Sequence, residues 1–138
     1  TTAGRAPSGS NIQPWKVHVL TGPALARFTT DLHTRHRQGD EGTREYNYYP
    51  VEWREPYLGR RRACGWGLYG LLGIGKADRA AMRAQHGENF LFFGAPVGLI
   101  FTIDRDMEPG SWLDMGMFVQ SVEFIAAAAN LREPGYGR

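Results

Sequence analysis

Residues 5–15 restrict the fold of this chain more than any other segment. They read Arg-Ala-Pro-Ser-Gly-Ser-Asn-Ile-Gln-Pro-Trp. Pro7 and Pro14 each fix the backbone angle φ and lack an N–H donor, so a regular helix cannot run through this stretch. Residues 15–20 then alternate apolar and polar side chains, which predicts a half-buried strand. We therefore expect an irregular loop that leads directly into a strand.

The same loop is rich in groups that can form hydrogen bonds. Ser8, Ser10, Asn11 and Gln13 together offer several side-chain donors and acceptors. Gly9 has no side chain, so another molecule can approach the backbone closely there. This chemistry suits a flat heterocycle with polar edges. The same residue types also favour turns and helix caps, and on residue types alone an ordinary turn segment is the simpler interpretation.

Size and composition indicate one soluble globular domain over residues 1–138. The chain is 42% hydrophobic and 22% charged, with a net charge of +2, which gives no electrostatic case for a nucleic-acid partner. The single cysteine, Cys64, cannot form an internal disulfide and suits a reducing compartment. We find no signal peptide and no apolar run long enough to span a membrane. The expected location is the cytoplasm.

Hydrophobic periodicity predicts both helices and strands, as in an α+β fold. Pro23 suits the first position of a helix, and Ser111 is the expected N-cap of a long C-terminal helix that ends at Asn130. An irregular, exposed excursion is expected over 38–56. The expected helices lie at 23–36, 76–85 and 112–129, and the expected strands at 15–20 and 96–103, the second being apolar enough for a central strand.

Two glycine-rich patterns could suggest nucleotide binding. Residues 70–76 match Gly-x-x-x-x-Gly-Lys, but Ala77 stands where a magnesium-binding hydroxyl is needed. Residues 65–70 match Gly-x-Gly-x-x-Gly, which is a weak signal without a preceding strand. Ordinary packing of a glycine-rich segment is the better interpretation of both patterns.

Other polar clusters have similarly plain interpretations. His33 and His36, near Asp31 and Asp40, could imitate a metal site, but a solvated helix end is several times more common. We therefore predict no metal. The basic run 60–62 suits either a phosphate of a nucleotide or a solvated turn, with equal weight. No Ser-His-Asp grouping is present that would support nucleophilic catalysis.

Three segments in order resemble the FMN-dependent nitroreductase family. Residues 7–15 resemble its Pro-Ser-x-x-Asn-x-Gln-Pro-Trp signature, and residues 89–97 its segment before the central strand. Residues 110–121 are similar to the start of its long central helix. The stretch 38–76 is similar to an insert that covers the active site in one branch of the family. These matches span the central portion of the family pattern; its N-terminal and C-terminal phosphate-binding segments are not among them.

The resemblance implies a mixed β-sheet covered by helices, in an interleaved homodimer with FMN at the interface. By the family pattern, Pro7, Ser8, Gly9 and Asn11 contact the flavin ring and Gln13 supports it. Trp112 and Asp114 are expected to line the pocket, although an acidic residue also favours the first turn of a helix, which is the alternative for Asp114. Residues 38–76 form a lid-like insert within the single domain.

The implied function is an FMN-dependent oxidoreductase. It passes electrons from NAD(P)H to an electron-poor small molecule such as a nitroaromatic or quinone. The flavin carries the chemistry, so no side chain is assigned as catalytic. The alternative is a truncated or degenerate flavin-fold protein that binds a ligand or partner without turnover. Neither interpretation includes a nucleic-acid or membrane partner.

Overall fold

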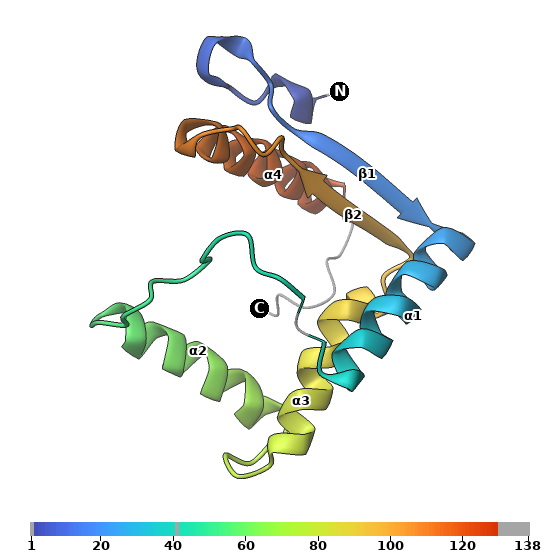
Figure 1. The fold of residues 1–138 in the computed structure, drawn as a ribbon, viewed down its shortest axis with the longest axis vertical. Coiled ribbons are helices and arrows are strands. Elements are labelled where there is room, and N and C mark those ends of the chain that lie inside the picture. The colour runs from blue at the N-terminus through green and yellow to red at the C-terminus, as the bar shows by residue number, and fades with distance from the viewer. Residues whose placement is uncertain (1, 41, 130–138) are drawn as a thin grey trace. The chain divides into compact units, whose positions relative to one another are not determined.

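The computed structural model describes residues 2–40 and 42–129 and has an α+β architecture (Figure 1). Its main elements, in chain order, are β1 (Lys16–Thr21), α1 (Gly22–Gln38), α2 (Tyr57–Leu71), α3 (Arg79–Gly87), β2 (Val97–Thr102) and α4 (Pro109–Ala128). Short 3₁₀ turns, η1 (Ala3–Arg5), η2 (Gly9–Asn11) and η3 (Glu88–Gly94), accompany them. The described residues divide into two compact units: those before residue 29 and after 91 form the first, and residues 29–91 form the second.

The first unit is built on an antiparallel pair of strands. β1 pairs with β2 in a register that sets Lys16 opposite Thr102 and Thr21 opposite Val97. A contact between His18 Nε2 and Thr102 Oγ1 at 3.0 Å and an ion pair between Lys16 and Asp104 reinforce one end of the ladder. Strand β1 thereby fixes the position of the loop that precedes it.

Helix α4 packs on this strand pair through an aromatic cluster. Phe118 of α4 meets Phe101 of β2 edge-on, with ring centroids 6.1 Å apart. It also stacks on Trp15, which stands immediately before β1. Phe118 is buried, as are Leu25 and Ala3. The core of the first unit therefore joins the loop, the strands and α4.

The second unit brings α3 against the C-terminal half of α1. The Arg83 guanidinium donates to the backbone carbonyls of His36 and Arg37, at 3.0 and 3.3 Å. His36 Nε2 lies 3.1 Å from the Arg83 carbonyl, and its ring stacks on Phe90. Because the last carbonyls of a helix lack partners within it, these bonds cap the end of α1. At the start of α3, Asp78 is the N-cap residue, and its side chain accepts from the Ala81 N–H at 2.9 Å.

Several predictions about helix ends and strand environments were wrong. Helix α4 begins at Pro109, with Glu108 rather than Ser111 as its N-cap, because proline is pre-organised for the first helical position. Its expected stop at Asn130 lies outside the described residues. Strand β1 is mostly exposed rather than half-buried, and β2 has one partner strand among the described residues rather than a central place. Within the described ranges, no helix is both long and apolar enough to cross a bilayer.

Candidate functional site

The polar loop at 7–13 is closed by hydrogen bonds within itself. The Gln13 backbone N–H donates to Ser8 Oγ at 3.1 Å. The Gln13 side-chain amide donates from Nε2 to Asn11 Oδ1 at 2.9 Å. Three of the predicted binding residues, Ser8, Asn11 and Gln13, therefore lie together. The loop is a defined structure on the surface of the first unit.

The loop backbone adopts a conformation that most residues avoid. Ser10, Asn11 and Gln13 have positive φ angles of 49°, 57° and 49°. Asparagine tolerates this left-handed region, whereas serine and glutamine enter it at a cost. Strained backbone of this kind clusters at ligand-binding sites, because the surrounding structure must hold it in place. The strain therefore favours a binding role for the loop over an ordinary turn.

Two side chains of α4, one turn apart, hold the loop in place. One contacts Gly9 within the loop, and the other contacts Trp15 just after it. The Gly9 N–H donates to Asp114 Oδ2 at 3.0 Å, a bond that spans 105 residues of sequence. The Trp15 ring stacks on Phe118, with centroids 4.6 Å apart and planes within 7°. Residues 114 and 118 share one face of a helix, since positions four apart are neighbours. Asp114 and Phe118 are thus positioning residues for the loop.

Asp114 anchors the loop, a role that the sequence did not suggest, and its expected place in the pocket wall stays a prediction. It is only 7% exposed, and its carboxylate meets the loop backbone. It does not stand in the first turn of α4, because the helix starts at Pro109. Sequence reasoning missed this anchor, although the Asp-x-x-x-Phe spacing on an apolar helix was a usable signal.

Replacing Asp114 with alanine is expected to lower the free energy of unfolding by about 1–3 kcal/mol, because the Gly9 N–H loses its acceptor in a partly buried place. Urea denaturation of the purified chain measures this difference. Asp114→Asn is the matched control, since its amide oxygen can still accept, and we expect it to lose less stability. Equal losses in the two variants would contradict the anchoring role.

The loop leaves a complementary set of polar groups for a ligand. Asn11 uses its side-chain oxygen inside the loop, which leaves its amide N–H groups as donors. Gln13 uses its amide nitrogen, which leaves its side-chain oxygen as an acceptor. Ser8 accepts through Oγ and retains its own O–H as a donor. Pro7, Gly9, Asn11 and Gln13 are exposed and Ser8 is half-buried. The pyrimidine edge of a flavin carries two carbonyl oxygens, which accept, and one N–H, which donates. A short loop that offers both donors and an acceptor is complementary to it.

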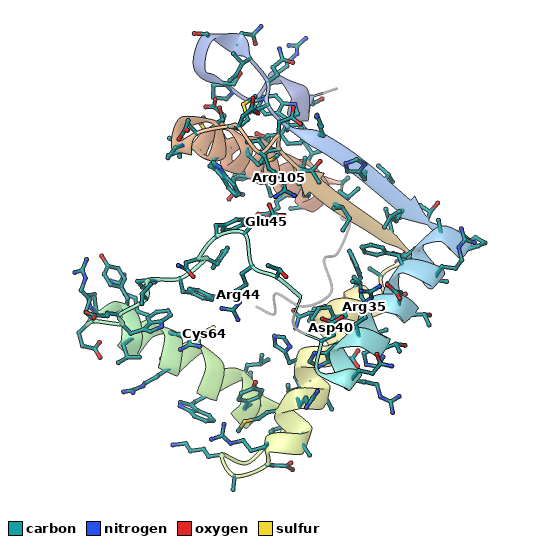
Figure 2. All side chains as sticks on the ribbon, viewed as in Figure 1. Arg35, Asp40, Arg44, Glu45, Cys64 and Arg105 are labelled. Carbon is teal, nitrogen blue, oxygen red and sulfur yellow. The ribbon has the colours of Figure 1, made fainter. Side chains whose placement is uncertain are left out.

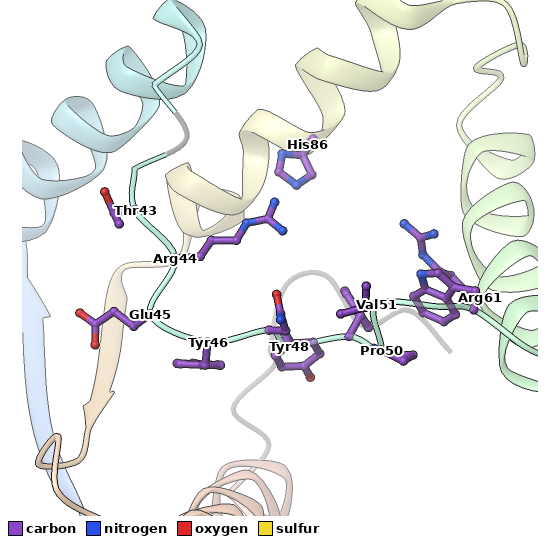
Figure 3. Close-up of a pocket in the computed structure, with 12 residues that line it drawn as sticks. Thr43, Arg44, Glu45, Tyr46, Tyr48, Pro50, Val51, Arg61 and His86 are labelled. Carbon is purple, nitrogen blue, oxygen red and sulfur yellow. The ribbon is translucent and has the colours of Figure 1, made fainter.

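The second unit contains a separate cavity of about 890 Å³ (Figure 3). The irregular segment 43–53 forms most of its wall, and Arg61 of α2 and His86 of α3 complete it. The lining includes three tyrosines, two arginines and one carboxylate, that of Glu45. All of its lining residues except His86 belong to the segment predicted as a lid-like insert.

The other candidate clusters are occupied by structural contacts. Arg35 lies at the end of α1 beside Asp40 (Figure 2) and pairs with Asp31 at 3.0 Å and with Asp40 at 3.6 Å. Across residues 2–40 and 42–129, no three His, Cys, Asp or Glu side chains are grouped as a metal would require. The glycine-rich run 70–76 follows helix α2 and not a strand, so it lacks the setting of a phosphate loop.

Comparison with known proteins places this loop in a family context. A model of the Nitroreductase family matches residues 1–132. A 4-nitrobenzoate reductase from Pseudomonas putida is 41% identical over 126 residues, which cover 91% of this chain and 55% of that protein. The chain thus spans about half the length of the curated relatives it matches.

Solved structures agree with this match. An FMN- and NADPH-dependent nitroreductase, NfnB, from a Sphigopyxis strain superposes with a TM-score of 0.87 at 41% identity, covering 92% of this chain and 57% of that one. The FMN-dependent nitroreductase NfnB from Mycobacterium smegmatis, solved with NADPH, gives a TM-score of 0.86 at 30% identity, covering 93% and 57%. Sequence and fold therefore agree that this chain belongs to the nitroreductase family.

Proposed function

We propose that this protein is an FMN-dependent oxidoreductase that passes electrons from NAD(P)H to an electron-poor acceptor such as a nitroaromatic or a quinone. The family match over residues 1–132 carries the proposal. The relatives named above, a 4-nitrobenzoate reductase and two FMN-dependent nitroreductases, support the choice of cofactor, donor and acceptor class. When bound, FMN supplies the two-electron chemistry itself.

In this proposal the chain binds and orients the flavin ring through the polar loop. Asn11 donates to a ring carbonyl, Gln13 accepts from the ring N–H, and Ser8 donates through its hydroxyl. Pro7 and Gly9 lie against the ring, because neither presents a bulky polar side chain. The anchors on α4 keep these groups in place before the ligand arrives, which reduces the entropy cost of binding.

Reconstitution with FMN tests the function. The purified chain is titrated with FMN and then supplied with NADPH and either 4-nitrobenzoate or a quinone, while NADPH absorbance is followed. We expect flavin binding and acceptor-dependent loss of NADPH. Flavin binding with no NADPH oxidation would instead support the alternative, a flavin-fold protein without turnover. Absence of flavin binding would refute the FMN-dependent function for this chain and favour the same alternative.

We also propose that the chain forms a homodimer. Helix α4 carries large apolar side chains that are exposed in the single chain, among them Leu113, Phe124 and Ile125. A helix that is apolar around much of its circumference needs cover on several sides. A second copy supplies this cover. Sedimentation velocity at micromolar concentration checks the proposal, and a monomer alone would refute it.

Residues 38–76 are proposed to act as a lid over the acceptor. Segment 39–56 contains no helix or strand among its described residues, and its large side chains Tyr48 and Val51 are strongly exposed. Exposed irregular segments with few internal contacts exchange their amide hydrogens fastest. We expect this segment to exchange faster than β2, and to slow when an acceptor analogue binds. Unchanged exchange would refute the lid.

The proposed location is the cytoplasm. Cys64 is a free thiol and is exposed on α2 (Figure 2). Exposed thiols persist in reducing compartments. Recovery of the native protein in a periplasmic or secreted fraction would refute this location.

A further inference from the structure

A second cavity, of about 690 Å³, lies between the end of the irregular segment and the start of α2. Its lining includes the aromatic residues Tyr49, Trp53 and Tyr57 and the arginines Arg54, Arg60 and Arg61. It shares Tyr49, Trp53 and Arg61 with the cavity of Figure 3. We call these six residues the aromatic–arginine cavity. All of them belong to the second unit.

Two of the three guanidinium groups of this cavity lie on aromatic faces. Arg61 Cζ lies 4.7 Å from the ring centroid of Trp53 and 5.8 Å from that of Tyr49. Arg54 Cζ lies 5.0 Å from the ring centroid of Tyr57. Such stacking uses the flat face of the guanidinium and leaves the N–H donors at its edge. Those edges can still bind a planar anion through two parallel hydrogen bonds.

The charge of the cavity is uncompensated. Its lining contains three arginines and no carboxylate, and all of its lining residues are described by the structure. Arg54, Arg60 and Arg61 form no ion pair with any described acidic residue. The nearby Glu55 instead accepts from the Gly59 N–H at 3.0 Å. Three arginines without an ion-pair partner, beside aromatic walls, match a ligand that is both anionic and aromatic.

We propose that the aromatic–arginine cavity binds a planar aromatic carboxylate. The ring of the ligand packs beside Trp53, Tyr49 and Tyr57, and its carboxylate meets the edges of Arg61 and Arg54. The volume accommodates a one- or two-ring compound with room for water. Binding needs neither FMN nor NAD(P)H, so this proposal can fail while the proposed function holds, and the reverse.

Isothermal titration calorimetry of the whole chain with naphthoate, which carries no reducible group, tests the proposal. We expect saturable binding to the wild-type chain, and binding about tenfold or more weaker to Arg61→Gln, because a charge-assisted bidentate contact is lost. Trp53→Leu is expected to weaken binding as well, since it removes the aromatic wall. Naphthamide, the neutral counterpart, is expected to bind more weakly than naphthoate.

Arg62→Gln is the matched control. Arg62 is the neighbour of Arg61 on α2 and carries the same charge, but it does not line the cavity. The affinity of Arg62→Gln for naphthoate should stay within about twofold of wild type, because an exposed charge that does not contact the ligand is screened by salt. Equal weakening by both arginine variants would overturn the proposal in favour of general attraction to a basic surface.

NADP⁺ serves as the competing ligand, because it also combines an aromatic ring with an anion. We expect NADP⁺ not to displace naphthoate from the flavin-free chain. Displacement that Arg61→Gln abolishes would overturn the carboxylate assignment and identify the cavity as a nucleotide phosphate site. Absence of saturable naphthoate binding to the wild-type chain would also overturn it. Circular dichroism melting curves verify that each variant is folded.

Discussion

Phe118→Ala is expected to lower the free energy of unfolding by about 3–5 kcal/mol, the range for truncating a buried phenylalanine. Phe118 is 6% exposed and contacts both the loop and the sheet. Its ring centroid lies 4.6 Å from that of Trp15 and 6.1 Å from that of Phe101. Among the described residues, Phe118 is the largest of three buried core side chains, so its truncation removes a large share of the buried apolar surface. Urea denaturation followed by tryptophan fluorescence measures the change.

Phe124→Ala is the matched control for this prediction. It removes the same side chain from the same helix, but Phe124 is 70% exposed. At concentrations where the chain is monomeric, we expect a change of less than about 0.5 kcal/mol. A loss as large as that of Phe118→Ala would mean that Phe118 is not the residue that joins the loop to the core.

Asn11→Ala is expected to weaken FMN binding by about five- to a hundredfold, equivalent to about 1–3 kcal/mol, because a buried polar edge of the flavin loses its partner. The free amide donor of Asn11 is the group that the flavin would use, since Oδ1 already accepts from Gln13. Fluorescence titration of FMN measures the affinity. Melting curves of the flavin-free protein show whether the fold is unchanged.

Two further variants separate binding from turn formation. Asn11→Asp keeps an acceptor for Gln13 and tolerates the positive φ of 57°, but it lacks the amide donor. We expect its FMN affinity to fall as in Asn11→Ala while its flavin-free stability stays near wild type. Ser10→Ala, at the neighbouring exposed position, should leave FMN affinity within about twofold. Wild-type affinity in Asn11→Asp would show that Asn11 only shapes the turn.

The local pattern of the sequence was sufficient for the two strands, for helices α1, α3 and α4 and for the candidate loop. It was not sufficient for helix α2, because the four glycines within Tyr57–Leu71 weaken a helical signal. Alternation over 15–20 and the apolar run over 96–103 predicted the two strands, and proline and apolar periodicity predicted α1 and α4. The loop itself was identified from Pro7 to Trp15, because prolines and strain-tolerant polar residues act through their own backbone. The resemblance to the nitroreductase family, carried by the same residues, was confirmed over 1–132.

Only the tertiary structure decided which side chains hold the loop and which remain free. Asp114 lies 105 residues from Gly9, so no local pattern could pair them. Phe118 and Phe124 are the same residue type on the same helix, yet Phe118 is buried against Trp15 and Phe124 is exposed. Burial and long-range hydrogen bonds depend on which elements meet, and short-range propensity carries no information about that. The sequence alone determined most of the elements and the chemistry of the loop, and the packing of α4 against the loop determined the loop's geometry.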